Sequence, residues 1–460
     1  MRLAALPSLL GVNELLRHYR EGVLRPRQVV DLTLERIAAA EATHGCVWIS
    51  LVSAAELRAR ADELAAGTPD EGLPLYGVPF AVKDNIDAAG LPTTAACPAF
   101  SYIPDRDAGS VRRLLDAGAI LVGKTNLDQF ATGLTGTRSP YGACQSVYGG
   151  DLVSGGSSSG SAVAVAAGLV PFTLGTDTAG SGRVPAAMNG IVGLKPTRGL
   201  VSTSGVVSAC RSLDCVSVFT RDLPDAATVL DVLAGHDPND PWSRVSERHF
   251  RSHGSCESAA RSGWKLAITA KGELDFEGDS AMAGAYLFVE GRAAAAAGGV
   301  QHTTLEPLLE AGDLLYGGPW VAERLAGLAD FLDTHPDDVL PVTRAVIERG
   351  AEFSAADAFG AIHRLRELRA WCDRLWEHAD ALLLPTVPTT FTRAQIAEQP
   401  HARNLVLGRY TQFANLLDLA AVALPAGTTD DGRPVGISLL GPAFAEARLL
   451  QIAHQLQEVS

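Results

Sequence analysis

The chain has 460 residues, of which 47 % are hydrophobic and 20 % charged, and its formal net charge at pH 7 is −14. Nucleic-acid binding needs clustered lysine and arginine, so this acidic balance argues against a nucleic-acid partner. The seven cysteines lack metal-ligand spacing, and we find no secretory leader pattern and no apolar run that would cross a bilayer. We therefore expect a cytoplasmic protein with buried thiols and without metal, cofactor or membrane partner.

Helices and strands alternate along the chain. Apolar residues with a period near 3.6 predict helices over 12–21, 27–41, 54–67, 110–119, 280–298, 322–332 and 446–457. Apolar runs between them predict strands at 44–52, within 73–87, and at 120–126, 264–270, 380–389, 415–427 and 433–444. This alternation predicts an α/β fold with a large mixed β-sheet covered by helices on both faces.

Residues 237–262 are polar and poor in aliphatic side chains. The strand pattern resumes directly after them, so we interpret this segment as a surface excursion and not as a domain boundary. We expect residues 1–460 to form one domain.

The stretch 151–198 contains two clusters of serine and glycine, GGSSSGS and DTAGSGR. An apolar segment, AVAVAAGLV, follows the first cluster, and Asp177 is the one ionisable side chain between Leu152 and Gly182. Apolar residues cost free energy in water, so a flexible linker is a poor interpretation. We predict a loop, a buried helix, a strand and a second loop, with both serine clusters in the interior.

Three catalytic designs could use these serines. Residues 156–160 match GxSxG, which would make Ser158 a nucleophile, but no clear strand precedes it and histidine is absent from 45 to 235. A phosphate-binding loop would need a following lysine that the first cluster lacks. The third design uses Lys83, at the end of an apolar strand, because burial can lower a lysine pKa by ~3–5 units. The alternative is that Lys83 extends its amino group to solvent or pairs with Asp84 or Asp87.

The long motif GGSSSGSAVAVAAGLVPFTLGTDTAGSGRVPAAMNGIVGLKPT resembles the amidase signature family, as do PFAVKDNID and LLLPTVP. The resemblance implies the family's fold, with a signature core at about 73–220, and a catalytic set of Lys83 as base, Ser157 in a cis peptide bond and Ser181 as nucleophile. It also implies an oxyanion hole at Thr178, Ala179, Gly180 and Ser181. Two positions, Ser159 and Ala179, depart from the usual pattern. We expect Asp177 and Arg183 to be paired scaffold charges.

The run ACRSLDCVSVF and the segment that carries Tyr316 and Arg324 are similar to allophanate hydrolases within this family. The resemblance implies that Tyr316 and Arg324 hold the carboxylate of a small amide substrate, since a guanidinium binds a carboxylate bidentately. Allophanate would then be cleaved to ammonia and N-carboxycarbamate through an acyl-enzyme. The alternative is that Tyr316 packs on Trp320 and Arg324 is a surface residue.

Other functions within the resemblance stay open. One is a glutaminase-type subunit of a tRNA-dependent amidotransferase, another is an amidase for a different small amide, and a third is an inactive relative. The complete set of Lys83, Ser157 and Ser181 argues against the inactive relative. We expect a homodimer, and no C-terminal decarboxylating domain within these 460 residues.

Overall fold

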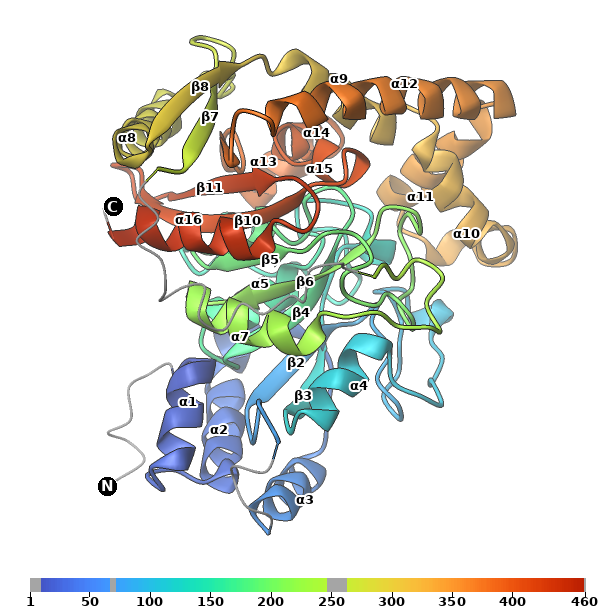
Figure 1. Cartoon of the computed structure of the whole chain (residues 1–460). Helices are drawn as coiled ribbons and strands as arrows, with labels where there is room; N and C mark the ends of the chain where they lie inside the picture. Colours follow the sequence, from blue (N-terminus) through green and yellow to red (C-terminus); the bar gives the residue numbers. More distant parts are fainter. Residues whose placement is uncertain (1–9, 67–71, 246–262, 459–460) are drawn as a thin grey trace.

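The structure, a computed structural model, describes residues 10–66, 72–245 and 263–458. Of the expected polar excursion, residues 246–262 lie outside the described residues. The described residues can be followed in Figure 1, coloured from the N-terminus to the C-terminus.

Eleven strands of the described chain form one sheet, in the order β1-β3-β2-β4-β6-β5-β10-β11-β9-β7-β8. They are β1 (Trp48–Leu51), β2 (Pro79–Lys83), β3 (Ile120–Thr125), β4 (Phe172–Asp177), β5 (Val192–Lys195), β6 (Cys215–Thr220), β7 (Lys265–Thr269), β8 (Gly299–Thr303), β9 (Ala381–Pro385), β10 (Ala420–Thr428) and β11 (Pro434–Gly441). The pairs β2–β3, β2–β4, β7–β8 and β7–β9 are parallel, and the other pairs are antiparallel. The predicted mixed sheet is confirmed.

Helices surround this sheet. They are α1 (Val12–Arg20), α2 (Pro26–His44), α3 (Ala54–Ala65), α4 (Gly109–Asp116), α5 (Ser159–Ala166), α6 (Val184–Met188), α7 (Leu223–Leu233), α8 (Ser280–Ala296), α9 (Glu306–Tyr316), α10 (Trp320–Thr334), α11 (Pro341–Glu348), α12 (Ala355–Leu375), α13 (Arg393–Glu398), α14 (Ala402–Gly408), α15 (Phe413–Leu416) and α16 (Glu446–Glu458). The helices predicted from the apolar period are all present within a few residues of the expected bounds.

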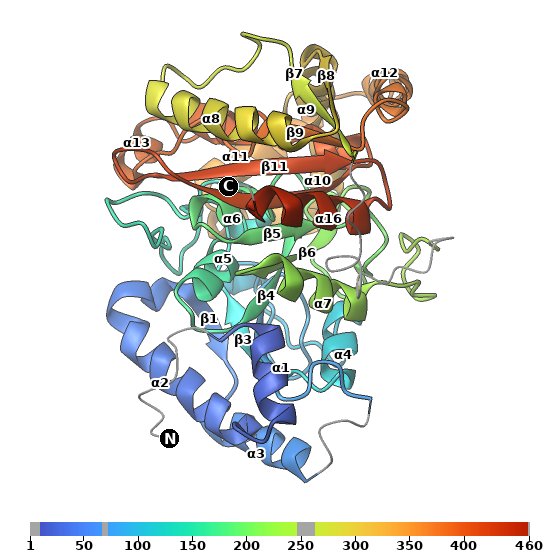
Figure 2. The same ribbon diagram turned by 60° about the vertical axis from the view of Figure 1, so that its left-hand side comes forward.

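Both faces of the sheet are covered, as predicted. Helices α7, α8 and α16 pack on one face, where they bury alternate residues of the central strands (Figure 2). Helices α5, α6 and α15 pack on the opposite face, and α9 and α12 lie outside α15. In β2, Phe80 and Val82 belong to the first face and Ala81 to the second, so Lys83 follows Ala81 onto the side of α5.

Two strands begin later than expected. The strand predicted at 415–427 starts only at Ala420, because Phe413–Leu416 form the short helix α15. The sequence predicts a strand over 44–52, but Gly45–Val47 form a 3₁₀ turn and β1 starts at Trp48. This turn is bonded to the residue that follows β3: the Val47 carbonyl accepts a hydrogen bond from the Asn126 N–H.

The buried helix predicted between the two serine clusters is α5. Its side chains are small, and residues 159–165 are all buried. Small residues let the helix approach the sheet closely: a Cβ atom at Gly160 would collide with the backbone of Val47 and Asn126. Ser158, at the N-terminal end of α5, donates a hydrogen bond to the Thr176 carbonyl of β4 at 3.1 Å. The first serine loop therefore lies against the end of the strand that leads into the second.

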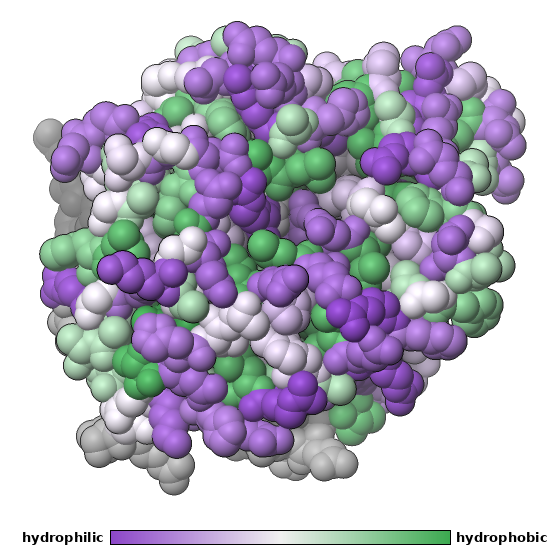
Figure 3. All heavy atoms as spheres, turned by 90° about the horizontal axis from the view of Figure 1, so that it is seen from above, coloured by the Kyte–Doolittle hydropathy of each residue, from purple (hydrophilic) through white to green (hydrophobic). Residues whose placement is uncertain are grey.

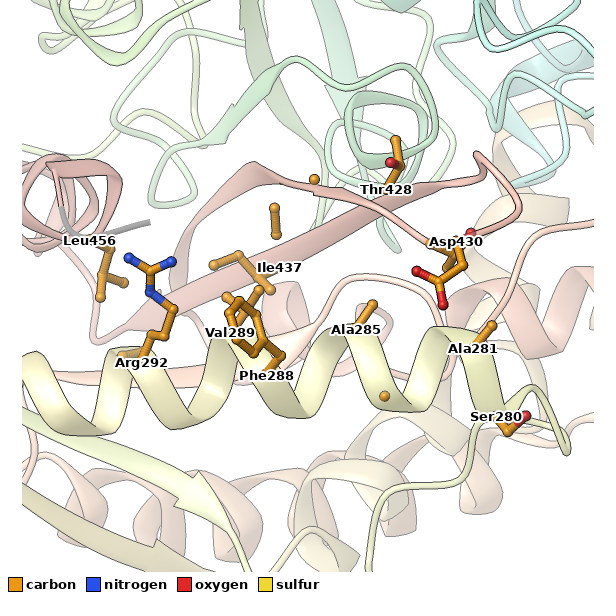
Figure 4. Close-up of a pocket in the computed structure, with 15 residues that line it drawn as sticks. Ser280, Ala281, Ala285, Phe288, Val289, Arg292, Thr428, Asp430, Ile437 and Leu456 are labelled. Atoms are coloured by element: carbon orange, nitrogen blue, oxygen red, sulfur yellow. The ribbon is translucent and has the colours of Figure 1, made fainter.

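On the face that carries β7, β8 and α12, hydrophilic and hydrophobic residues are interspersed (Figure 3). A pocket of about 530 Å³ lies between α8 and the antiparallel pair β10–β11, with Phe288, Arg292 and Ile437 on its walls (Figure 4). No residue predicted for the active site lines this pocket. Among the described helices, none combines the length and the apolar character that a membrane span requires.

The stacked pair Phe80 and Phe172, whose ring centroids are 5.4 Å apart, joins β2 to β4 on the face of the sheet opposite α5. Both rings are fully buried. We expect Phe172→Ala to reduce the free energy of unfolding by about 3–5 kcal/mol, because it leaves a cavity in the core. The shift in the urea midpoint measures this loss. Phe359→Ala removes a ring of α12 that is 63 % exposed and should change stability by less than about 0.5 kcal/mol; equal shifts would contradict the role given to the pair.

Candidate active site

Lys83 ends β2 and its side chain is fully buried. Its Nζ atom donates hydrogen bonds to Ser157 Oγ at 2.7 Å and to Thr176 Oγ1 at 2.8 Å. No carboxylate of the described residues forms an ion pair with it. The alternative pairing with Asp84 is wrong: that carboxylate lies 3.4 Å from Lys124 Nζ.

The surroundings of Lys83 make it a weak base. Burial lowers its pKa to about 7, because an ammonium ion loses its hydration there. The carboxylates of Asp128, Asp214 and Asp177 oppose this shift, whereas the Arg324 guanidinium adds to it. A large fraction of Lys83 is therefore neutral near pH 7 and able to accept a proton.

Ser157 lies in the loop before α5 and is fully buried, and the Gly156–Ser157 peptide bond is cis. Its carbonyl oxygen accepts hydrogen bonds from the N–H groups of Asp128 at 3.0 Å and Ser159 at 2.9 Å. The Ser159 hydroxyl donates to the Asn126 carbonyl at 3.5 Å. This first departure from the usual motif is thus accommodated in the packing of the loop against the end of β3.

The second loop is organised by a buried ion pair. Arg183 donates from Nε and Nη2 to the two carboxylate oxygens of Asp177, at 2.9 and 3.0 Å. The same oxygens accept the N–H groups of Gly180 at 2.8 Å and Gly182 at 3.0 Å. Burial alone would raise the pKa of Asp177, but Arg183 holds it below its usual value. The predicted pairing of these scaffold charges is confirmed.

Ser181 lies in this loop and is 3 % exposed. Its hydroxyl forms no hydrogen bond to the described residues; in particular, none joins it to Ser157. The structure thus brings Lys83 and Ser157 into direct contact and leaves the Ser181 hydroxyl unengaged.

The four backbone amides predicted for the oxyanion hole differ in their partners. The Gly180 N–H donates to Asp177, so this amide is already engaged. The N–H groups of Thr178, Ala179 and Ser181 have no acceptor in the part of the chain that the structure describes. The backbone explains why residue 180 is glycine: its φ is +133°, and a Cβ atom there would collide with Thr411 Oγ1.

The carbonyl and side-chain groups of the loop are held by its neighbours. Thr411 Oγ1 donates to the Ala179 carbonyl at 2.8 Å, and Asn415 Nδ2 donates to the Asp177 carbonyl at 2.7 Å. The Thr178 hydroxyl donates to the carboxylate of Asp214. These bonds fix the loop from outside and leave the three amides available to a ligand.

Tyr316 ends α9 and Arg324 lies in α10, and both are buried, at 8 % and 2 % exposure. The Arg324 Cζ atom lies 5.7 Å from the centroid of the Tyr316 ring. Nη1 donates to Thr132 Oγ1 and, at 3.5 Å, to the Ala131 carbonyl. The interpretation of Arg324 as a surface residue is wrong.

The second terminal nitrogen of Arg324, Nη2, is buried without a hydrogen-bond partner among the described residues. Buried polar atoms are nearly always paired, because an unpaired donor costs about 1–3 kcal/mol. The charge of Arg324 acts on Lys83 and on Asp214, so the free donor lies in the same charged environment as Lys83. A bound anion would satisfy it.

Three residues of this site escaped the sequence analysis. Thr176 is the second partner of Lys83, Thr132 is the partner of Arg324, and Asp128 donates its N–H to Ser157. Thr176 lies near the end of β4 and Asp128 soon after β3, and a polar residue at the end of an apolar strand is the signal that could have identified these two. Thr132 follows the 3₁₀ turn Gln129–Ala131 and carries no such signal.

The chain is similar to known proteins over nearly its whole length. The family model described as Amidase matches residues 28–450. A urea amidolyase of Saccharomyces cerevisiae is 45 % identical over 89 % of this chain, which spans 22 % of that protein. A glutamyl-tRNA(Gln) amidotransferase subunit from Symbiobacterium thermophilum is 35 % identical over 98 % of this chain and 97 % of its own length.

Solved structures agree with this result. The allophanate hydrolase of Kluyveromyces lactis superposes with a TM-score of 0.91 at 41 % identity, over 98 % of this chain and 73 % of that chain. The fold, the match to the family model and the identities lead to one conclusion: the chain belongs to the amidase family.

Proposed function

We propose that the chain hydrolyses the terminal amide of allophanate, releasing ammonia and N-carboxycarbamate. The observation that carries the proposal is the hydrogen bond from Lys83 to Ser157, because Lys83 is buried and forms no ion pair with a carboxylate of the described residues. The unpaired Arg324 nitrogen supports an anionic amide as the substrate. The similarity to urea amidolyases and to the Kluyveromyces lactis allophanate hydrolase supports the same choice.

In the proposed reaction the Ser181 hydroxyl attacks the carbonyl carbon of the terminal amide. Its proton passes to Ser157 as the Ser157 proton passes to Lys83 Nζ. The oxyanion that forms accepts hydrogen bonds from the backbone N–H groups of Thr178, Ala179 and Ser181. Each of these donors contributes ~3–4 kcal/mol to transition-state stabilisation. The amine nitrogen then takes the proton back from Lys83 through Ser157, and ammonia leaves.

The acyl group is then carried on Ser181 as an ester. Water attacks this ester and gives a proton to Lys83 through Ser157. When the C–O bond to Ser181 breaks, that proton returns from Lys83 through Ser157 to the Ser181 oxygen, which restores the hydroxyl and releases N-carboxycarbamate. Throughout, the substrate carboxylate accepts hydrogen bonds from Arg324 and the Tyr316 hydroxyl. A guanidinium offers two parallel donors to a carboxylate, which fixes the reacting amide as well as binding it.

Three further parts of the proposal concern the whole protein. We propose a cytoplasmic location, which the six free cysteines of the described residues support, since free thiols are typical of reducing compartments. We propose one domain, which the single sheet of the described strands supports. The homodimer stays a prediction.

Ammonia release tests the substrate. We expect kcat/KM for allophanate to exceed that for biuret, a neutral analogue of similar shape, by about 10- to 150-fold. This ratio corresponds to the free energy that one charge-assisted hydrogen bond contributes to binding. Malonamide and glutamine should be poorer still. Efficient glutamine hydrolysis would favour the amidotransferase subunit instead. Ser181→Ala should reduce turnover by at least about 10³-fold, whereas the exposed Ser101→Ala should not change it.

The pH dependence of kcat/KM tests Lys83 as the base. Only neutral Lys83 accepts a proton, and its pKa is about 7. We therefore expect log kcat/KM to rise with unit slope below pH 7 and to level off above it. A rise that continued toward pH 10, the range of an ordinary lysine, would contradict the assignment.

Arg324→Ala tests the carboxylate site. We expect the KM for allophanate to rise by about 10- to 100-fold, because the charge-assisted bonds to the carboxylate are lost, and the KM for biuret to change by less than about threefold. Arg366→Ala, on the exposed surface of α12, is the matched control and should change neither. Equal effects on both substrates would contradict the role given to Arg324.

A further inference from the structure

We propose that Asp128 is a positioning residue for the catalytic base: it anchors the Ser157 loop and supplies the negative charge that keeps Lys83 basic enough to work. The inference rests on the proposed function, in which Lys83 draws a proton from Ser157. No motif of the sequence analysis assigned a role to Asp128. It follows β3 and is fully buried.

Asp128 contacts the serine loop through both its backbone and its side chain. Its N–H donates to the Ser157 carbonyl at 3.0 Å, and the Ser157 hydroxyl is the acceptor for Lys83. Its carboxylate lies against Gly156, where a Cβ atom would collide with Oδ2. The residue before Ser157 must therefore be glycine for the carboxylate to occupy this place.

Each oxygen of the carboxylate accepts a hydrogen bond from a backbone N–H. Oδ1 accepts the Arg138 N–H at 2.8 Å, and Oδ2 accepts the Gly136 N–H at 3.0 Å. Burial raises the pKa of Asp128 above its usual value, although the Arg138 guanidinium and these amides oppose part of the shift. A proton on either oxygen would compete with an N–H that already points at it, so the two donors favour the charged form.

Four charged groups act on Lys83 from the surrounding elements: Asp128 after β3, Asp177 at the end of β4, Asp214 before β6 and Arg324 on α10. Burial lowers the pKa of Lys83, and Asp128 opposes this more than Asp214 or Asp177 does. The difference has a structural reason for Asp177, whose carboxylate is neutralised by the bidentate pair with Arg183. Asp128 is left as the main counter-charge.

Asp128→Asn tests the inference, because it removes the charge and keeps the size of the side chain. The probe is methanesulfonyl fluoride, whose sulfonylation of Ser181 reports the activated hydroxyl without the need for allophanate. The second-order inactivation rate is measured from pH 5.5 to 9.5, and peptide mass confirms labelling at Ser181. We expect the inflection to move to lower pH by roughly 0.5–2 units, and the plateau rate to fall because the base is weaker.

Two variants control for other causes. Asp128→Glu keeps the charge, so its inflection should stay close to that of the unmodified protein even where the rate falls. Asp87→Asn removes a part-exposed carboxylate four residues after Lys83 that accepts hydrogen bonds from Thr93 and Tyr102. It should shift nothing.

An unchanged inflection in Asp128→Asn, or equal shifts in the Asn and Glu variants, would overturn the inference. Failure of both variants to fold would also overturn it, since Asp128 would then be needed for the fold itself. Labelling at Ser181 with the expected shift, but no hydrolysis of allophanate, would reject the substrate and support the inference. Absence of labelling in the unmodified protein would reject the catalytic set on which the inference rests.

Discussion

The burial of the Lys83 amino group between two hydroxyls is the interaction on which the rest of the site depends. A carboxylate in hydrogen-bond contact would stabilise the ammonium ion and abolish its use as a base. The fold avoids this outcome, although Asp84 is the next residue in the chain. The Asp84 side chain pairs with Lys124 and Thr94, and Lys83 is left with Ser157 and Thr176.

The two serine loops meet the requirements of this base in different ways. The first is carried by a short buried helix of small residues, which can approach the sheet closely enough for Ser157 to reach Lys83. The second is shaped around the Asp177–Arg183 pair. Buried ion pairs add little net stability, but they impose geometry. Here the Asp177 carboxylate accepts the hydrogen bond of the Gly180 N–H, while the neighbouring N–H groups have no acceptor among the described residues.

In the proposed function, elements outside this common core select the substrate. The amidase family includes proteins with several names, so the fold alone does not select a substrate. Arg324 comes from α10, far along the chain from the serine motif, and its buried Nη2 leaves the site unsatisfied. An anion at this position would replace a missing hydrogen bond, which gives a physical reason for an acidic substrate.

The sequence by itself determined the α/β class and part of the elements, because apolar periodicity is a local property, and the resemblance of its long motif to a known family implied the candidates Lys83, Ser157 and Ser181. It did not predict β5, β6, β8, α7, α9 or α12. It could not identify Thr176, Asp128 or Thr132, nor exclude the Asp84 pairing or a surface position for Arg324. It also could not distinguish the engaged Gly180 amide from its three neighbours. Only the tertiary structure decided these points, because they depend on which side chains from distant segments meet in the interior and which donors find an acceptor there.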